Sequence, residues 1–192
     1  MRLLFFAGST REGSYNKKLA ALARHIAEAN GIEAVQVDLK DYPMPLYNGD
    51  LEAKDGPPKR ARAFKALLGE YQGVFIASPE YNSSITPLLK NTLDWVTRVR
   101  GKGETGLEVY QTRVFAISGA SPGYYGAMRS LLHLRQILEV GIGATVIPQQ
   151  IAVPRATDAF EADGSLKDAA QRKLCTDVVE ALAVAAKRFV VP

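Results

Sequence analysis

Five short apolar runs alternate with segments of helical periodicity along the chain, and this alternation limits the possible folds more than any other feature. We interpret the apolar runs as strands at Leu3–Ala7, Ala34–Val37, Gly73–Ala77, Val114–Ser118 and Thr145–Pro148. We interpret the periodic segments as helices at Asn16–Asn30, Pro58–Glu70, Pro87–Val99, Tyr125–Val140 and Ser165–Phe189. Strands that alternate with helices form parallel sheets covered on both faces. The sequence therefore predicts an α/β fold, a three-layer sandwich around a five-stranded parallel sheet, in a single domain of residues 1–192.

Strand order follows from the unusual segment after the first apolar run. Five parallel strands with such a loop after the first are typical of the order 2-1-3-4-5. In that order a ligand binds beyond the carboxyl ends of the strands, beside strand 1. We therefore expect the loops after strands 1, 3 and 4 to form the functional site.

The loop after the first strand reads Gly8-Ser-Thr-Arg-Glu-Gly-Ser-Tyr-Asn16 and leads into a helix. Exposed backbone N–H groups at a helix start attract anions. The side chains that can add to them are those of Ser9, Thr10, Arg11, Ser14 and Asn16. Because the loop lacks the glycine spacing of dinucleotide folds and the Gly-Lys-Ser/Thr of nucleotide-triphosphate loops, it favours a phosphomonoester. A solvated, serine-rich helix cap is the alternative interpretation.

The loops after the third and fourth strands are long for strand-to-helix connections. The first runs from Ser78 to Pro87 and offers Tyr81 and free backbone amides to a flat ligand. The second runs from Ser118 to Gly126 and contains three glycines, which let a backbone approach a ligand closely. Together the two loops predict a pocket for a large planar molecule.

Composition limits the partners and the cellular compartment. The net charge of +4 comes from scattered Lys and Arg, so it suits small anions and gives little support to nucleic-acid binding. The single Cys175 excludes an internal disulfide and a Cys-rich metal site, and we expect a buried, inert thiol. The first apolar run is too short for a signal peptide, and no stretch approaches the ~20 apolar residues of a membrane span. We expect a cytoplasmic protein without membrane insertion.

Four motifs occur in the order found in a known family. They are Gly8-Ser9-x-Arg11-x-x-Ser14-x-Asn16, Pro79-Glu-Tyr-Asn82-x-Ser84, Leu89-Lys-Asn91-x-x-Asp94-Trp95 and Ser121-Pro-Gly123. With them the chain resembles the NADPH-dependent FMN reductases of the flavodoxin-like superfold, a group that includes bacterial chromate, quinone and azo-dye reductases. The resemblance extends over nearly the whole chain, and it implies a flavodoxin-like fold and FMN as the cofactor.

The resemblance also implies roles for individual residues. Side chains of Ser9, Arg11, Ser14 and Asn16 would bind the FMN phosphate, while Thr10 and Tyr15 would contribute mainly backbone. The flavin ring would be bordered on one side by Pro79, Glu80, Tyr81 and Asn82, and on the other by the loop that starts with Ser118, Gly119 and Ala120. No catalytic side chain is required, because the flavin carries the redox chemistry. Glu80 as a proton donor is the alternative.

The implied activity is that of an NAD(P)H oxidoreductase. NADPH, or NADH, would reduce bound FMN, which would then reduce a quinone or another small acceptor such as chromate, an azo compound or a nitro compound, with ping-pong kinetics. The resemblance further implies a homodimer or homotetramer, formed through the helices after strands 3 and 4. Two alternatives stay open: a flavodoxin-like electron carrier without efficient NADPH oxidation, and a flavin-free regulatory protein.

Several residues have an open or neutral interpretation. Family members often have two consecutive glycines where this chain has Gly126-Ala127, and we expect the added methyl to narrow the ligand's approach slightly. Tyr124 and Tyr125 would either wall the substrate pocket or pack beneath the following helix. His25 and His133 have no metal-ligand spacing and are expected at the surface or an interface. The helix after the third strand carries an apolar stripe of the kind found in a protein core or in a dimer contact. It consists of Leu88, Leu89, Leu93, Trp95 and Val96.

Overall fold

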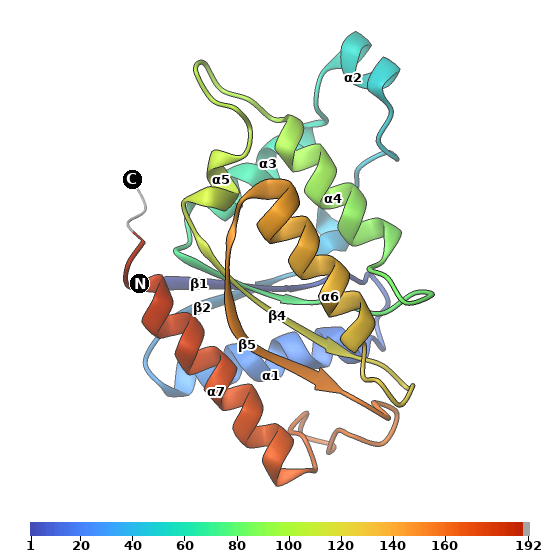
Figure 1. Ribbon diagram of the computed structural model, residues 1–192, viewed down its shortest axis with the longest axis vertical. Coiled ribbons are helices and arrows are strands. Elements are labelled where there is room, and N and C mark those ends of the chain that lie inside the picture. Colours follow the sequence, from blue (N-terminus) through green and yellow to red (C-terminus); the bar gives the residue numbers. More distant parts are fainter. Residues whose placement is uncertain (190–192) are drawn as a thin grey trace.

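The computed structural model describes residues 1–189, which form one all-parallel sheet in the order β2-β1-β3-β4-β5 (Figure 1). The strands are β1 Arg2–Ala7, β2 Glu33–Val37, β3 Gly73–Ala77, β4 Val114–Ala120 and β5 Thr145–Val153. Every predicted strand is present, and the predicted order 2-1-3-4-5 is confirmed. Because the chain enters at β1, moves outward to β2 and returns to β3, the switch point lies at the carboxyl ends of β1 and β3.

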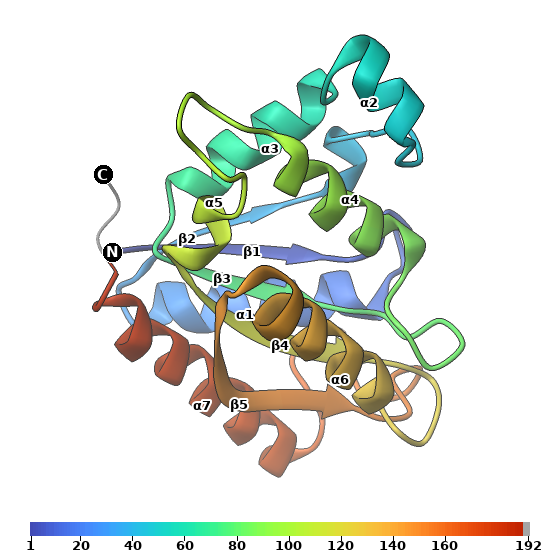
Figure 2. The same ribbon diagram turned by 45° about the horizontal axis from the view of Figure 1, so that its top comes forward.

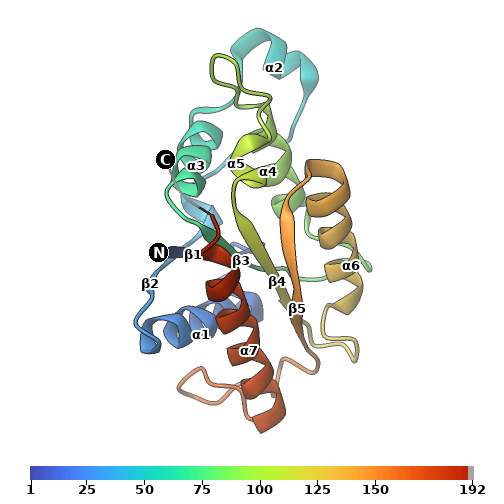
Figure 3. The ribbon, with the colours of Figure 1, turned by 60° about the vertical axis from the view of Figure 1, so that its left-hand side comes forward.

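Helices cover both faces of the sheet (Figures 2 and 3). On one face, α1 (Tyr15–Ala29) and α7 (Ala169–Ala186) enclose one apolar cluster with the sheet. On the other, α3 (Lys59–Gly69), α4 (Pro87–Arg98) and α6 (Met128–Gln136) enclose a second. The central strands are buried on both sides, which explains why their sequences are continuous apolar runs without alternation.

Four short helical segments add to the predicted elements, and only the last of them overlaps a predicted helix, Tyr125–Val140. They are a 3₁₀ turn at Leu39–Asp41, α2 (Gly49–Asp55), α5 (Glu108–Gln111) and a π-type turn at Ile137–Ile142 that continues α6. Helix α2 stands away from the sheet at the top of Figure 1 and has no buried residue. Such a segment has no apolar periodicity for a sequence pattern to detect.

Several predicted boundaries were wrong: α7 begins at Ala169 instead of Ser165, β4 ends at Ala120 instead of Ser118, and two further differences have identifiable reasons. Strand β5 continues to Val153 instead of ending at Pro148, because the β4–β5 register shifts between the pairs Phe115–Val146 and Ile117–Gln150. The shift places the proline in an irregular stretch where its missing N–H interrupts no ladder. Helix α6 begins at Met128 instead of Tyr125, because Ala127 has a left-handed φ of 73°.

The apolar stripe of α4 belongs mainly to the core. Leu89, Leu93, Trp95 and Val96 are all buried, and the Trp95 indole N–H donates to the Pro45 carbonyl at 2.7 Å. The helix begins where the sequence predicts, with the Thr86 hydroxyl accepting from the Leu89 N–H and Pro87 in the first turn.

Arg113 lies just before β4, at the amino-terminal edge of the sheet, and is buried. Its guanidinium donates to the carbonyls of Leu68 and Gly69 at the end of α3, at 2.5 and 2.6 Å, and to the Val109 carbonyl of α5 at 2.8 Å. Burial lowers the pKa of this group. The charge has carbonyl oxygens at two helix carboxyl ends as its partners, where cations are favoured.

None of the helices within residues 1–189 has the length and apolar character needed to cross a membrane.

Candidate functional site

Three loops meet at the carboxyl-terminal edge of the sheet, on the right-hand side of Figure 1. Main-chain bonds hold them together: the Gly8 N–H donates to the Ala77 carbonyl at 2.9 Å, and the Ser78 N–H to the Ser118 carbonyl at 2.7 Å. Between the loops lies a cleft of about 100 Å³. Its lining residues are Ser9, Arg11, Ser14, Tyr15, Asn16, Pro79, Glu80, Tyr81, Ala120, Ser121 and Pro122.

The first loop presents hydrogen-bond donors to this cleft. Ser14 is the N-cap of α1 and accepts from the Lys17 N–H, while the Ser9 hydroxyl accepts from the Arg11 N–H at 3.3 Å. Within the described residues, the first-turn N–H groups of Tyr15 and Asn16 have no acceptor. Free N–H groups, two hydroxyls and an exposed guanidinium form a donor set that suits a phosphate dianion.

Asn16 connects two of the loops that line the cleft. Its side chain is buried, its Nδ2 donates to the Ala120 carbonyl at 2.8 Å, and its Oδ1 accepts from the Ala120 N–H at 2.9 Å. Both ends of the amide therefore contact the end of β4, and the side chain ties two loops together, while the second hydrogen of Nδ2 is left for a further acceptor. Its own main-chain N–H stays available.

Sequence reasoning missed Lys17, which supports the same loop from α1. Its Nζ donates to the Thr10 carbonyl at 3.0 Å and pairs with the Asp38 carboxylate at 2.6 Å. Burial alone would raise the pKa of Asp38, but the bonds from Lys17 and from the Lys40 N–H outweigh it, and the pKa lies below its usual value. Lys17 thus joins the loop after β1 to the end of β2.

The loop after β3 is a tight hairpin. Tyr81 and Ser84 exchange main-chain hydrogen bonds at 2.9 and 3.0 Å, and Asn82 and Ser83 between them have left-handed φ values of 51° and 67°. Two left-handed central residues are the signature of a type I′ turn. The hairpin turns Asn82 outward, away from the cleft lining, while Pro79, Glu80 and Tyr81 line it. At its base, the Thr86 hydroxyl donates to the Gly8 carbonyl at 2.7 Å.

Two of the three residues predicted at the start of the loop after β4 lie deeper in the sheet than expected. Ser118 and Gly119 belong to strand β4 and are buried, with the Ser118 hydroxyl donating to the Ile76 carbonyl at 3.3 Å. A Cβ on Gly119 would lie 2.7 Å from the Ala127 Cβ, so glycine is required for packing at this point. Ala120 lines the cleft, and Ser121 and Pro122 join it in place of Ser118 and Gly119.

The tyrosines after β4 do not pack beneath α6. Tyr124 and Tyr125 are exposed, and their rings meet edge to face with centroids 5.5 Å apart. Ala127, by contrast, is only 1% exposed, and its methyl faces Gly119 in the interior. The expectation that this methyl narrows the ligand's approach is therefore wrong.

Other reactive side chains lie apart from the cleft. His25 is exposed on α1 beside Glu28, and His133 on α6 has its Nδ1 3.0 Å from the Ser84 hydroxyl oxygen. Burial raises the pKa of the Cys175 thiol to about 12, as expected for an inert core cysteine. Within residues 1–189, no cluster of His, Cys, Asp and Glu side chains forms a metal site.

Two larger hollows flank the cleft without sharing its loop geometry. One of about 480 Å³ borders the outer edge of β2 and includes Lys17 and Arg24. The other, of about 670 Å³, lies between Tyr124 and the loop that contains Arg155 and Lys167. We place the functional site in the smaller cleft, because only there do the loops after β1, β3 and β4 meet at the switch point.

Comparison with known proteins assigns this arrangement to a family. Residues 1–158 match the family of NADPH-dependent FMN reductases. The chain is 34% identical over 192 residues to an NAD(P)H-dependent FMN reductase of Pseudomonas aeruginosa, an alignment that covers 98% of this chain and 97% of that protein. It is 33% identical over 138 residues to a quinone reductase of Escherichia coli K12, covering 72% of this chain and 69% of the relative.

Among solved structures, the fold is similar to that of FerB, a flavoenzyme NAD(P)H:(acceptor) oxidoreductase from Paracoccus denitrificans. The two superpose with a TM-score of 0.80 and 26% sequence identity, over 98% of each chain.

Proposed function

The chain belongs to the NADPH-dependent FMN reductase family, and we propose that the cleft between the loops after β1, β3 and β4 is its FMN site. As a member of that family, the protein is an FMN-dependent NAD(P)H oxidoreductase that acts on quinones. FMN supplies the hydride-transfer chemistry of such an enzyme. The observation that carries the assignment is the convergence of a phosphate-type donor set and two long loops on one cleft.

Each loop has a separate task in this proposal. Ser9, Arg11, Ser14 and the free N–H groups of the first turn of α1 bind the phosphate. Pro79, Glu80 and Tyr81 border one side of the ring, and Ala120, Ser121 and Pro122 the other. Asn16 acts as a tie between phosphate loop and ring loop, through Ala120. Thr10 contributes its main chain, which Lys17 holds in place.

We further propose that electron donor and acceptor use the cleft in turn. At about 100 Å³ the cleft is well below the volume of pockets that enclose drug-sized ligands, so part of a bound FMN stays outside it, and we propose that this part includes one face of the ring. A nicotinamide from NADPH or NADH and then a quinone can stack on that same face at roughly 3 to 3.5 Å. Two substrates that occupy the same position cannot bind at the same time. Plots of reciprocal initial rate against reciprocal NADPH concentration, at several fixed quinone concentrations, should therefore be parallel lines.

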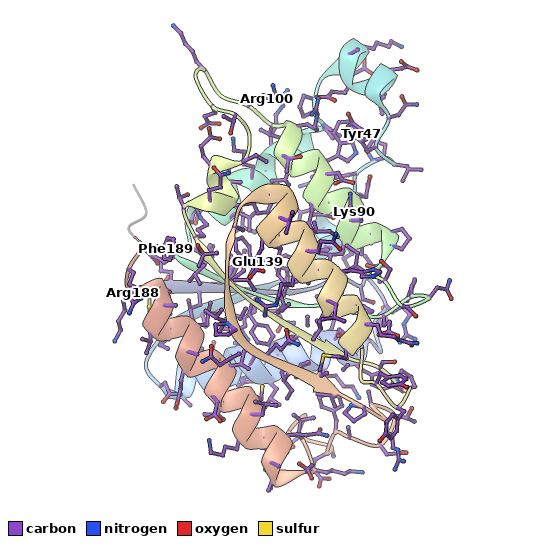
Figure 4. The ribbon with its side chains drawn as sticks, viewed as in Figure 1. Tyr47, Lys90, Arg100, Glu139, Arg188 and Phe189 are labelled. Atoms are coloured by element: carbon purple, nitrogen blue, oxygen red, sulfur yellow. The ribbon has the colours of Figure 1, made fainter. Side chains whose placement is uncertain are left out.

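We also propose a homodimer, or a homotetramer built from two such dimers, with the dimer formed through α4 and α6. These helices cover the same face of the sheet (Figures 1 and 2), and α6 exposes Leu132, which is 60% exposed, and Val140 in the adjoining turn, which is 82% exposed. The same face carries charged side chains, among them Lys90 on α4 and Glu139 beside α6, both labelled in Figure 4. Leu132→Glu should yield monomers in sedimentation experiments, whereas an unchanged mass would exclude this surface.

The activity is proposed to operate in the cytoplasm, where reduced nicotinamide nucleotides are available. The single buried cysteine, free of any disulfide, is consistent with that compartment.

The decisive experiment is an absorbance spectrum of the protein after incubation with FMN and removal of free flavin, followed by anaerobic addition of NADPH. We expect a bound-flavin band that bleaches rapidly and returns when a benzoquinone is added. A band that persists would indicate an electron carrier, and a protein that retains no flavin would overturn the assignment.

A further inference from the structure

The Glu80 side chain is almost completely buried beside the cleft, and both of its partners come from the first turn of α6. Its side chain is only 6% exposed. One carboxylate oxygen accepts from the Arg129 Nε at 2.7 Å and also from Arg129 Nη2, while the other accepts from the Ser130 N–H at 3.3 Å. The hairpin after β3 is thus attached to the start of α6 by a paired charge and a main-chain bond.

This attachment substitutes for a missing helix cap. The N-cap position of α6 is Ala127, whose side chain has no oxygen to accept a first-turn N–H. Ser130 is the third residue of the helix, the position that an N-cap side chain usually satisfies. The Glu80 carboxylate takes that place from a distance of 50 residues in sequence, and its negative charge suits a helix amino terminus.

Arg129 also contacts the loop after β4. Its guanidinium carbon lies 5.1 Å from the centre of the Tyr125 ring, and that ring meets Tyr124 edge to face. A cation within about 6 Å of an aromatic ring is attracted to its face. One guanidinium therefore joins the hairpin that borders the cleft on one side to the loop that borders it on the other.

We propose that Arg129 is a positioning residue that sets the spacing of the two ring-side loops and neutralises the Glu80 carboxylate beside the flavin; this rests on the proposed FMN site. Without Arg129 the carboxylate would be a poorly solvated, uncompensated negative charge at the cleft. Such a charge disfavours the addition of electrons to a neighbouring group. Arg129 therefore affects the reduction potential of the flavin and the kcat/KM for the quinone acceptor, whereas the phosphate loop sets the affinity for FMN.

The test compares Arg129→Met, Arg129→Lys, Glu80→Gln and the double variant Glu80→Gln/Arg129→Met with the wild type. For Arg129→Met we expect a lower flavin midpoint potential and a quinone kcat/KM reduced about tenfold, equivalent to about 1.4 kcal/mol. We expect FMN dissociation constants to change less than about threefold, because the phosphate contacts are intact. In the double variant the potential should return toward the wild-type value, and Arg129→Lys should recover part of the loss.

A second readout needs no flavin. In urea unfolding of the apoprotein, removal of Arg129 should cost less when residue 80 is already Gln, because the two side chains form one unit. Lys173→Met, which breaks the exposed Lys173–Asp177 pair on α7, is the matched control and should change neither potential nor kcat/KM.

The outcomes are distinguishable. An Arg129→Met enzyme whose potential and kcat/KM match those of Lys173→Met, or additive effects in the double variant, would overturn the role of Arg129 alone. If Arg129→Met does not fold, the same criteria apply to Arg129→Gln, which also removes the charge but keeps a polar side chain. A wild-type protein that retains no flavin, or whose flavin NADPH does not bleach, would overturn the proposed function and this inference with it.

Discussion

The side chain of Asn16 and the main chain of Ala120 exchange two hydrogen bonds, although 104 residues separate them in sequence. Both groups are buried, and the pair joins the first turn of α1 to the last residue of β4. It connects the part of the cleft that we assign to phosphate with the part that we assign to the ring. Through this pair, the position of one loop depends on that of the other.

Asn16→Ala should lower the free energy of unfolding by about 2 to 4 kcal/mol, because it leaves the buried N–H and carbonyl of Ala120 without partners. Urea denaturation measures the change. The control is Asn30→Ala, which removes an exposed side-chain bond to the Ile26 carbonyl and should cost about 1 kcal/mol or less. Equal losses in the two variants would contradict the role of the Asn16–Ala120 pair.

Arg11→Ala should weaken FMN binding by about 1.5 to 3 kcal/mol, the range expected for a charge-assisted hydrogen bond to phosphate. Titration of the apoprotein, followed by quenching of flavin fluorescence, gives the dissociation constant. Arg188→Ala makes the same change of charge at the opposite edge of the molecule, as Figure 4 shows, and should leave the affinity unchanged. Unaltered affinity in Arg11→Ala would remove this residue from the site.

Ala127→Gly should change stability by no more than about 1 kcal/mol. Relief of the left-handed φ of 73°, worth about 1 to 2 kcal/mol, offsets the lost methyl and the greater freedom of the unfolded chain. Ala23→Gly, at an equally buried position inside α1, gains no such relief and should cost about 2 kcal/mol. Thermal unfolding of both variants measures the two changes in stability. Similar losses of stability in the two variants would mean that the backbone at position 127 is not strained.

Arg113→Met should destabilise the fold by about 3 to 5 kcal/mol without affecting FMN affinity. The substitution keeps the apolar stem but leaves the carbonyls of Leu68, Gly69 and Val109 without their donor. Chemical denaturation and flavin titration measure the two quantities. Arg60→Met, at an exposed position on α3, is the control and should stay within about 0.5 kcal/mol of the wild type.

The segment before α5 should lose stabilisation in acid. Main-chain bonds from Thr105 at 2.5 Å and Gly106 at 2.9 Å hold the pKa of Glu108 at about 2, below its usual 4.5. Because the folded pKa is depressed, this stabilisation is complete above about pH 4.5 and is lost as the pH falls toward 2. The stability difference between wild type and Glu108→Gln should therefore shrink over that interval.

Local signals in the sequence were enough to predict the order of the strands in the sheet and where two helices begin. Strands β1, β3 and β4 are apolar runs because they are buried on both faces, and Ser14 and Thr86 are caps of the kind that sequence patterns predict. The polar helix α2 and the continuation of β5 past Pro148 escaped prediction. Helix α2 has no buried residue, and the continuation of β5 depends on a register shift between β4 and β5.

The site was predicted in outline, because its loops are recognisable, but not in its internal connections. Nothing in the neighbourhood of Asn16 indicates Ala120 as its partner, and nothing near Glu80 indicates Arg129. Such pairs depend on the tertiary approach of segments about 50 to 100 residues apart, which no local periodicity encodes. The burial of Gly119 has the same origin, because strand β4 extends to Ala120, two residues beyond the predicted run Val114–Ser118.

The position of Arg113 also has an evolutionary consequence. It secures α3 and α5 at the amino-terminal edge of the sheet, whereas every loop that borders the cleft leaves the opposite edge. Laboratory selection for new electron acceptors can therefore vary the hairpin after β3 and the tyrosines after β4. The Arg113 contacts at the other edge of the sheet stay intact and continue to stabilise the fold. Libraries restricted to those loops should retain a larger share of folded clones than libraries spread over the whole chain.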